Sequence, residues 1–484
     1  MRIAYSVETV RTAERELMDR LPDGVLMQRA AAGLAAACVD LLRRRGRVYG
    51  ARVVLLVGSG DNGGDALYAG ARLARRGAGV SAVLLNPGRA HAGGLTALVG
   101  SGGRFLDNSS DPFDVLAAAD LVVDGITGIG GRGGLRPDAV PVARAARGSG
   151  AVVVAVDLPS GVEAGSGEVV GEALRADATV TFGTYKAGHL IDPAREYVGA
   201  VRLVDIGLGA VLPSVPELEA LQHADVARLL PVPTGESDKY RRGVVGVVAG
   251  SARYPGAAVL AVAGALHGGA GAVRYVGPAG DAVIARFPET LVHAGPPAKA
   301  GRVQAWVVGP GLGDEPGVRD AVASDVPVLI DADGLRGLDA GAVRARTAPT
   351  LLTPHAGEAA ALLGVPREEV EAGRLAAVRE LTARYGATVL LKGSTTLVAS
   401  PDTADPVRVN PTGTPWLATA GSGDVLSGLT GSLLAAGLTA RDAGSVGAYL
   451  HGLAARAAAQ GAPVSAEDVG AALRGAWRDV SREG

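Results

Sequence analysis

At 484 residues the chain is too long for one ordinary core, and 48% hydrophobic with 20% charged residues is the profile of a globular protein with two or more domains. A net charge of −2, without a basic stripe, argues against nucleic-acid binding. Cys38 is the only cysteine, which excludes an internal disulfide and a thiolate metal cluster. The charged, amphipathic segment Met1–Asp40 resembles neither a signal peptide nor a membrane span, so we expect a cytoplasmic protein.

Short apolar runs alternate with Ala-rich helical stretches along the whole chain, which predicts α/β architecture with largely parallel sheets. In the first half the expected strands are Arg52–Val57, Val80–Leu85, Leu121–Asp124, Ala151–Asp157, Ala178–Phe182 and Val201–Asp205. In the second half they are Val244–Ala249, Ala272–Val276, Ala305–Val308, Val326–Asp331, Pro349–Thr353, Thr388–Leu391 and Thr396–Ala399.

The segment Val211–Ser237 carries four prolines around a short acidic helix, a composition typical of a stiff linker. We place the domain boundary near Pro213–Gln222, with one domain over residues 1–213 and the other over residues 222–484. A short-period repeat is not visible, so a solenoid is disfavoured.

The first expected strand runs into a glycine turn, Gly58-Ser59-Gly60-Asp61-Asn62-Gly63-Gly64-Asp65, and we expect a helix from about Ala66. Strand, glycine turn and helix N-terminus together favour an anion site, because backbone N–H groups point outward there. Asn62 and Asp65 add oxygen groups that are unusual in a Rossmann loop. A purely structural turn is the alternative.

Two later strands also end in oxygen-bearing residues, at Asp124-Gly125-Ile126-Thr127-Gly128 and at Asp157-Leu158-Pro159-Ser160-Gly161. Ligands of parallel sheets sit at the carboxyl ends of the strands, so these loops should converge on one crevice. Asn62, Asp124 and Ser160 offer only hard oxygen groups, which suits an alkali or alkaline-earth cation rather than zinc. Helix capping by Asp157 and Ser160 is the alternative.

These motifs, with Val156–Gly161 and the run Thr181-Phe182-Gly183-Thr184-Tyr185-Lys186-Ala187-Gly188, resemble the NAD(P)H-hydrate epimerase family over essentially Met1–Gly209. The resemblance implies a potassium ion held by Asn62, Asp124 and Ser160. It also implies substrate binding by Asp61, Asn62, Gly63, Gly64, Asp65, Gly128, Ile129, Gly130, Gly131, Arg132, Gly133, Gly134 and Asp157. Asp61 departs from the family, which usually has Asn at that position.

Asp157 and Lys186 are the expected catalytic pair of the first half. C6 of a nicotinamide hydrate bears a hydroxyl and is bonded to N1, so inversion by ring opening or by transient loss of hydroxide needs proton transfer. A carboxylate and an amine can serve as acid–base partners. Only four of the 47 basic residues are lysines, which indicates positions where a compact, titratable ammonium is needed, with chance as the alternative.

The second half contains a long motif from Asn410 to Asp424 that ends in Gly421-Ser422-Gly423-Asp424, where a helix is expected to begin at about Asp424. Backbone N–H groups there would face a transferring phosphoryl group, and Asp424 could take a proton from a hydroxyl nucleophile. A mere helix cap is the alternative. A Walker-type loop is absent, so the phosphate site is not that of a P-loop enzyme.

Further motifs follow other strands, namely Gly309–Gly313, Asp331–Gly334, Thr353–Glu358 and Leu391–Thr396. Together they resemble the ADP-dependent NAD(P)H-hydrate dehydratase family, a branch of the ribokinase-like fold, over about Gln222–Arg474. The resemblance implies hydrate binding by Ala257, Gly311, His355 and Asp424, and nucleotide binding by Lys392, Gly393, Ser394, Thr395, Thr396 and Gly423. Arg242 and Ala420 depart from the family's usual lysine and glycine.

The resemblances imply a Rossmann-like epimerase domain followed by a ribokinase-like dehydratase domain, an isomerase and a lyase in one chain. The expected ligands are the hydrates of NADH and NADPH, ADP with Mg²⁺, and K⁺. We expect a homo-oligomer, and neither a nucleic-acid nor a membrane partner. The alternatives are a ribokinase-like kinase of a vitamin precursor with a fused nucleotide-binding domain, and a binding scaffold without turnover.

Overall fold

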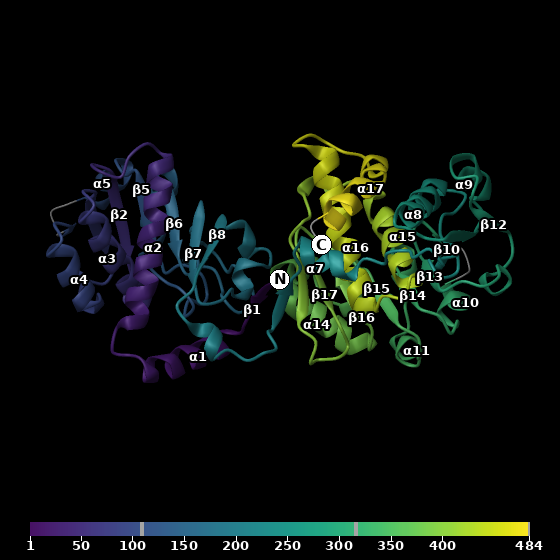
Figure 1. Cartoon of the computed structure of the whole chain (residues 1–484), viewed down its shortest axis with the longest axis horizontal. Helices are drawn as coiled ribbons and strands as arrows, with labels where there is room; N and C mark the ends of the chain where they lie inside the picture. Colours follow the sequence, from purple (N-terminus) through teal and green to yellow (C-terminus); the bar gives the residue numbers. More distant parts are fainter. Residues whose placement is uncertain (107–110, 314–317, 483–484) are drawn as a thin grey trace. The chain divides into compact units, whose positions relative to one another are not determined.

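The computed structural model describes residues 1–106, 111–313 and 318–482. It divides the chain into two compact units (Figure 1), Ile3–Glu217 and Leu218 onward, the latter together with Met1–Arg2. The division falls inside the expected boundary region. Met1 and Arg2 differ from the expectation: the Met1 ammonium lies 2.8 Å from the Asp225 carboxylate, within the C-terminal unit.

The N-terminal unit is built on a seven-stranded sheet in the order β4-β3-β2-β5-β6-β7-β8, in which all neighbouring strands are parallel. Its strands are β2 Arg52–Val57, β3 Gly79–Leu84, β4 Arg104–Phe105, β5 Leu121–Gly125, β6 Val152–Val156, β7 Ala178–Phe182 and β8 Ala200–Val204. This is the doubly wound Rossmann order, extended by β8, and the strand order reverses between β2 and β5. A ligand crevice is therefore expected beyond the carboxyl ends of β2 and β5.

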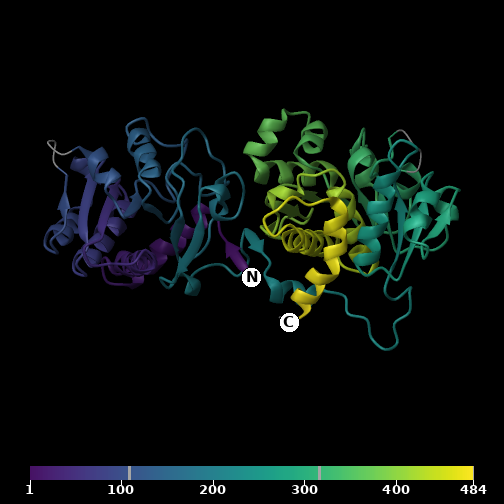
Figure 2. The same ribbon diagram turned by 90° about the horizontal axis from the view of Figure 1, so that it is seen from above.

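Helices cover both faces of this sheet (Figure 2). They are α1 Val7–Arg20, α2 Val25–Arg44, α3 Asp61–Ala74, α4 Ala92–Val99, α5 Pro112–Ala117 and α6 Val140–Gly148, with short 3₁₀ turns η1 Pro87–Arg89, η2 Ala187–His189, η3 Ala194–Glu196 and η4 Leu208–Ala210. In β2, Val53 and Leu55 pack with α2 and α3, whereas Val54 and Leu56 pack with α5 and α6. By length and composition α2 could cross a membrane, but its buried face accounts for its apolarity by packing in this core.

The C-terminal unit is built on an 11-stranded sheet in the order β1-β9-β18-β17-β16-β15-β14-β13-β10-β11-β12. Its strands are β9 Leu218–Ala220, β10 Val244–Val248, β11 Ala272–Val276, β12 Leu291–His293, β13 Ala305–Val308, β14 Val328–Ile330, β15 Thr350–Leu352, β16 Thr388–Leu391, β17 Thr396–Ala399 and β18 Val407–Asn410. The edge strand is β1, Arg2–Ala4, of which only Arg2 belongs to this unit. Strands β10 to β16 pair in parallel, whereas β17 pairs antiparallel with both β16 and β18.

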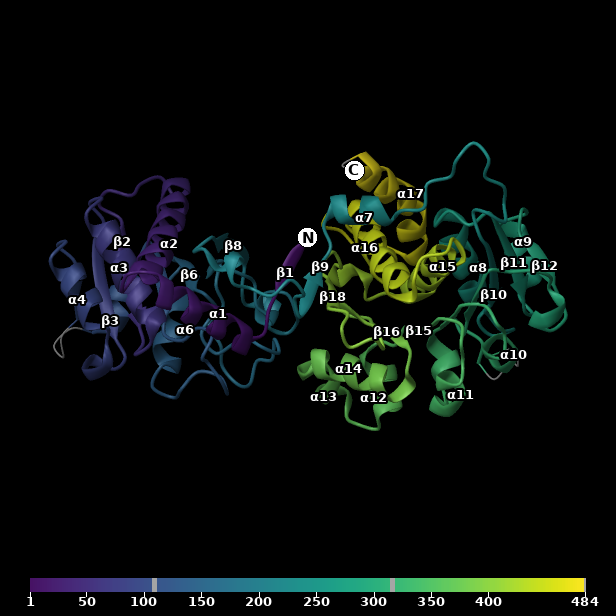
Figure 3. The ribbon, with the colours of Figure 1, turned by 60° about the horizontal axis from the view of Figure 1, so that its bottom comes forward.

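Helices also flank this second sheet (Figure 3). They are α7 His223–Leu229, α8 Pro255–His267, α9 Gly280–Arg286, α10 Val318–Val322, α11 Ala340–Arg344, α12 Ala356–Leu363, α13 Arg367–Ala372, α14 Arg374–Tyr385, α15 Ser422–Ala435, α16 Ala440–Ala459 and α17 Ala466–Arg482, with 3₁₀ turns η5 Pro297–Lys299, η6 Ala332–Leu335 and η7 Pro415–Leu417. The main core packs α8, α15, α16 and α17 against the sheet.

All expected strands form, with ends shifted by at most two residues, but three expectations were wrong. Helix α3 begins at Asp61 rather than near Ala66, so the residues Asp61–Asp65 are its first turns. Residues 157–177 contain no helix, which excludes helix capping by Asp157 and Ser160. The proline-rich segment is more than a linker, because β9 pairs with β18 and Val226 of α7 lies in the C-terminal core.

Helices α8 and α15 approach so closely that glycine is required on both. A Cβ on Gly264 would lie 2.2 Å from the Val425 carbonyl oxygen, and one on Gly428 would lie 1.9 Å from the Ala261 carbonyl oxygen. Backbone cannot give way as a flexible side chain can. This contact therefore fixes the position of α15 relative to α8. The first turn of α15 contains Asp424.

Gly428→Ala should destabilise the C-terminal unit by about 3 kcal/mol, because the added methyl group overpacks a helix contact made by backbone. The matched control is Gly475→Ala in α17, where a Cβ meets nothing within 4 Å. That variant should gain about 0.5–1 kcal/mol from helix propensity. Calorimetric unfolding of both variants checks the prediction, and equal stability of the two would contradict it.

Candidate active sites

The loops at the reversal point of the N-terminal sheet bring the predicted oxygen groups together. Asn62, in the first turn of α3, donates from Nδ2 to the Val156 carbonyl at 2.6 Å. The main-chain carbonyl oxygen of Asn62 lies 3.0 Å from the position that a Cβ on Gly125 would take, and Gly125 is the residue after Asp124. The loop at Gly128 lies against the Asn62 side chain, because a Cβ there would meet Oδ1 at 2.4 Å. Glycine at 128 is therefore needed for this approach.

Asp124 and Ser160 form a fully buried pair at the ends of β5 and β6. The Ser160 hydroxyl donates to Asp124 Oδ1 at 2.6 Å, and the Ser160 N–H donates to Oδ2 at 2.8 Å. Burial raises the pKa of Asp124 to about 6, although these bonds lower it. In the described part of the chain no basic side chain is paired with Asp124. The site is thus a buried carboxylate ringed by oxygen and N–H groups.

Asp157 and Lys186 form a second buried pair, as their predicted joint role requires. Lys186 Nζ lies 2.6 Å from Asp157 Oδ1, and the Thr181 hydroxyl donates to the same oxygen at 2.9 Å. Burial would raise the pKa of Asp157, but the Lys186 ammonium and these bonds hold it below its usual value. Asp157 also has φ of 64°, a strained backbone for a non-glycine residue that is typical of functional sites.

His189 holds both members of this pair in place. Its Nδ1 accepts from the Lys186 N–H at 3.0 Å, and its Nε2 lies 2.7 Å from the Asp157 carbonyl oxygen. Burial and the nearby Lys186 charge lower the pKa of His189 to about 4, so the ring is neutral and carries its proton on Nε2. His189 therefore has a structural role, which is to position the pair.

Two more carboxyl groups face the pair, Asp65 of α3 and Glu14 of α1. Oδ1 of Asp65 is buried and has no hydrogen-bond partner among the described residues. Burial, Asp157, Asp61 and Glu14 raise its pKa well above the usual value. Burial also raises the pKa of Glu14, which interacts with Lys186 and Asp157. Sequence reasoning missed Glu14; its signal was a carboxylate one position after the buried Ala13 on the apolar face of a helix.

In the C-terminal unit the loops after β14, β15 and β16 meet the first turn of α15. Lys392 Nζ lies 2.6 Å from Asp331 Oδ1 and 3.6 Å from Glu358 Oε2. The Ser427 hydroxyl of α15 donates to the other Asp331 oxygen at 2.6 Å. Asp331 and the neighbouring carboxylates raise the pKa of Lys392 although burial opposes this, so the ammonium keeps its charge. The sequence pointed to the motifs of Asp331 and Glu358 but assigned neither a role.

Asp424 lies beside this cluster, within the first turn of α15. Burial and the Asp331 charge raise its pKa to about 7, despite the opposing effect of Lys392. A Cβ on Gly423 would lie 3.6 Å from Lys392 Nζ, which joins the glycine turn to the lysine loop. The helix begins at Ser422, and the N–H of Asp424 already donates to the Gly421 carbonyl at 3.1 Å. The N–H of Asp424 is therefore not one of the outward-facing donors expected in this turn.

The remaining predicted residues occupy the neighbouring loops. A Cβ on Gly311, which has φ of 61°, would lie 2.5 Å from Cβ of Ala257, so these two expected hydrate contacts touch. His355 caps α12, with Nδ1 accepting from the Glu358 N–H at 3.1 Å and its side chain exposed. Residues Gly393–Thr395 form the turn from β16 to β17, which the buried Arg374 braces by donating to the Lys392 and Thr395 carbonyls.

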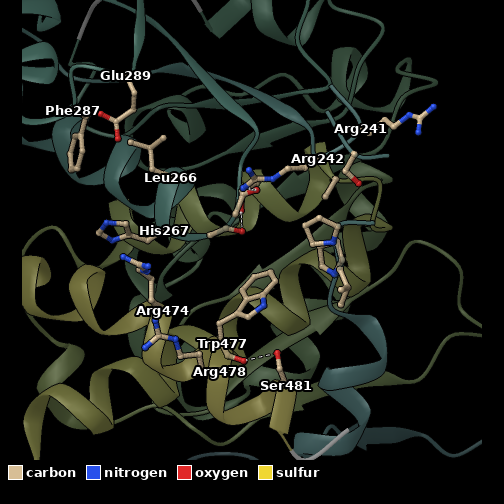
Figure 4. Close-up of a pocket in the computed structure, with 18 residues that line it drawn as sticks. Arg241, Arg242, Leu266, His267, Phe287, Glu289, Arg474, Trp477, Arg478 and Ser481 are labelled. Atoms are coloured by element: carbon tan, nitrogen blue, oxygen red, sulfur yellow. Dashed lines mark hydrogen bonds between the residues drawn. The ribbon is translucent and has the colours of Figure 1, made fainter. Parts of the chain in front are cut away.

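A hollow of about 870 Å³ lies elsewhere in the C-terminal unit (Figure 4). It is lined by Arg241 and Arg242, which precede β10, so it opens at the amino end of that strand rather than at the carboxyl end. Helices α8, α9 and α15 end there, and Arg242 donates to the Gly269 carbonyl at 3.1 Å. Helix carboxyl ends carry partial negative charge, which these arginines offset. The hollow is thus separate from the loops at the carboxyl ends of the strands, where Lys392 and Asp331 lie.

The two sheets and their strand-end sites define a two-domain α/β enzyme, with a Rossmann-like unit followed by a ribokinase-like unit. The family described as NAD(P)H-hydrate dehydratase matches residues 245–472, and the family described as YjeF-related protein N-terminus matches residues 23–188. A protein of Mycobacterium leprae named bifunctional NAD(P)H-hydrate repair enzyme Nnr is 50% identical over 477 residues, covering 97% of this chain and 95% of its own. The chain belongs to this family of bifunctional repair enzymes.

More distant relatives agree with this assignment. A protein of the same name from Moorella thermoacetica is 35% identical, covering 93% of this chain and 92% of its own. Among solved structures, the ADP/ATP-dependent NAD(P)H-hydrate dehydratase of Bacillus subtilis, co-crystallized with ATP/Mg²⁺, is 29% identical with a TM-score of 0.50. It covers 55% of this chain and 99% of that chain, which supports the ribokinase-like fold of the C-terminal unit.

Proposed function

We propose that this chain repairs hydrated NADH and NADPH in two reactions. The N-terminal unit interconverts the R and S hydrates at C6, and the C-terminal unit dehydrates the S hydrate at the expense of ADP, giving NAD(P)H, AMP and phosphate. The observation that carries this proposal is the presence, in one chain of this family, of an Asp–Lys pair at the strand ends of each unit, buried in the N-terminal unit and partly buried in the C-terminal unit. A vitamin-precursor kinase or a binding scaffold would not need the charged pair of the N-terminal unit.

For epimerisation, Asp157 is the base and Lys186 assists it. The lowered pKa of Asp157 keeps it ionised, so it can accept the proton of the C6 hydroxyl during ring opening. Burial and the neighbouring carboxylates raise the pKa of Asp65 and so favour its protonated form, which can return a proton to the opened ring. Buried groups with pKa values pushed in opposite directions suit opposite steps of proton transfer.

For dehydration, Asp424 accepts the C6 hydroxyl proton while that oxygen attacks the β-phosphorus of ADP and releases AMP. Lys392 neutralises the transferring phosphoryl group, and Mg²⁺ bound with the nucleotide would offset its remaining charge. The carboxylates of Asp331 and Glu358 are the kind of ligand that magnesium takes together with phosphate oxygens. Loss of phosphate from C6 and of a proton from C5 then restores the ring double bond.

Asp157→Asn should reduce R-to-S conversion by about 10²–10⁴, because Asn keeps the shape but cannot accept the proton. Asn also tolerates the left-handed backbone at this position better than Ala. The activity is measured as the return of the reduced-nicotinamide absorbance band when an equal mixture of the R and S hydrates is incubated with ADP. The variant should consume only the S half, and consumption of both halves at the wild-type rate would contradict the assignment.

The control for folding is the double variant Asp157→Asn/Lys186→Met, which removes both charges of the pair. The single variant strands a buried ammonium, so it should unfold at a lower temperature than the double variant. Stability should therefore recover in the double variant, whereas epimerisation should not. Recovery of both would show that the pair is structural.

Asp424→Asn should retain nucleotide binding but lose about 10²–10⁴ in dehydration rate. In the wild type the rate constant kcat/KM for dehydration should fall as the pH drops through about 7, because the base must be ionised. Asp331→Asn removes a neighbouring negative charge that raises the pKa of Asp424, so the fall in kcat/KM should move to lower pH. Asp424 would be excluded as the base if Asp331→Asn left the pH dependence of kcat/KM unchanged, or if Asp424→Asn were active.

We also propose that K⁺ binds at Asn62, Asp124 and Ser160. Asp124 supports this, because a fully buried carboxylate without a basic partner in the described residues gains from a cation. Ionising Asp124 costs stability as the pH rises through about 6, since its pKa in the unfolded chain is about 3.9. Bound K⁺ offsets this cost only where Asp124 is ionised.

K⁺ should therefore raise the unfolding temperature of the N-terminal unit more at pH 8 than at pH 5, and it should stimulate epimerisation but not dehydration. Choline chloride at equal ionic strength is the control for nonspecific salt effects. In Asp124→Asn both potassium effects should vanish. Equal stabilisation by K⁺ at the two pH values would argue against this site.

A further inference from the structure

A cavity of about 660 Å³ opens beside helix α1 in the N-terminal unit. Ser6, Arg11 and Arg15 line it from α1, Arg132 lines it from the loop after β5, and Glu163 lines it from the loop after β6. Its volume lies within the range of about 300–1,000 Å³ that is usual for small-molecule sites. The loop residues Gly130 and Gly131 also line it, so the cavity adjoins the segment on which substrate binding is expected.

Arg11 reaches from α1 onto this glycine loop. Its Nη2 lies 2.9 Å from the position that a Cβ on Gly130 would take, so a side chain there would displace the guanidinium. In the part of the chain that the structure describes, neither Arg11 nor Arg132 forms a salt bridge. Both are exposed to the cavity side of the surface. Two guanidinium groups that form no salt bridge among the described residues therefore face the same hollow.

Helix α1 also connects the cavity with the reacting groups. Glu14 lies one turn after Arg11, and its electrostatic partners are Lys186, Asp157, Asp61 and Arg11 itself. Residues three apart lie on one side of a helix, with a rise of about 1.5 Å each. Glu14 thus connects Arg11 electrostatically with the buried Asp157–Lys186 pair.

We propose that this cavity binds the diphosphate of the hydrated dinucleotide, with Arg11 and Arg132 as its ligands. The inference rests on the proposed function of the N-terminal unit and extends it to residues of α1. Guanidinium groups bind phosphate oxygens in pairs of charge-assisted hydrogen bonds, and the positive end of α1 adds to the attraction. Glu8 and Glu163 line the same cavity and suit the ribose hydroxyls. Arg11 and Arg132 thereby select dinucleotides over mononucleotides.

The test compares epimerisation of the R hydrates of NADH, NADPH and reduced nicotinamide mononucleotide, which lacks the diphosphate bridge and the adenosine. In Arg11→Gln and Arg132→Gln, KM for both dinucleotides should rise by about 10- to 100-fold, as expected for charge-assisted bonds. The value of kcat should change by less than about threefold. The mononucleotide hydrate keeps one of the two phosphates, so its KM should rise by a smaller factor, below about fivefold.

Arg20→Gln is the matched control, because Arg20 lies on the same helix, pairs with Glu16 and does not line the cavity. It should leave all three KM values unchanged, and dehydration of the S hydrate should be normal in every variant. An equal rise in KM for mononucleotide and dinucleotides, or no rise at all, would overturn the proposal.

Calorimetric titration with ADP-ribose separates this inference from the proposed function. The wild type should show one class of binding site that Arg11→Gln/Arg132→Gln lacks and Arg20→Gln retains. If that class is present while epimerisation is absent, the proposed reaction fails and the diphosphate site stands. If epimerisation is normal and that class is absent from the wild type, the diphosphate site fails and the proposed reaction stands.

Discussion

A lysine paired with a buried aspartate organises the site of each unit. Lys186 lies 2.6 Å from Asp157, and Lys392 lies 2.6 Å from Asp331. Removing two charges from water costs several kcal/mol per ion, so such a pair persists only where further bonds complete its geometry. Thr181 and His189 supply these bonds in the N-terminal unit, and Ser427 does so in the C-terminal unit. The strand ends must therefore meet accurately.

In each unit the lysine pairs with one carboxylate, and the pKa of a second carboxylate is raised. In the N-terminal unit Lys186 holds down the pKa of Asp157, whereas Asp65 forms no ion pair among the described residues and its pKa rises. In the C-terminal unit Lys392 is paired with Asp331, so Asp424 is left with burial and a neighbouring negative charge, and its pKa reaches about 7. Each unit thus contains one carboxylate fixed by lysine and one poised to carry a proton.

Helix packing determines where these groups stand. Contact of α15 with α8 through glycines sets the position of Asp424, and α1 brings Glu14 and Arg11 over the N-terminal site. Both helices are remote in sequence from the strand-end residues of the sites to which they contribute. The catalytic geometry of each unit is therefore a property of its helix layer as much as of its sheet.

The sequence by itself determined the positions of the strands along the chain, the glycine turns and the residues at the strand ends, because apolar runs and turn residues are local signals. It also indicated Lys186 and Lys392, two of only four lysines. It placed the start of α3 at Ala66 instead of Asp61, since glycines in a first helical turn look like a loop. Only the tertiary structure decided that Asp331 pairs with Lys392, that Oδ1 of Asp65 has no hydrogen-bond partner among the described residues, and that Arg11 lies on Gly130. These facts depend on distances between residues far apart in the chain, which local patterns do not encode.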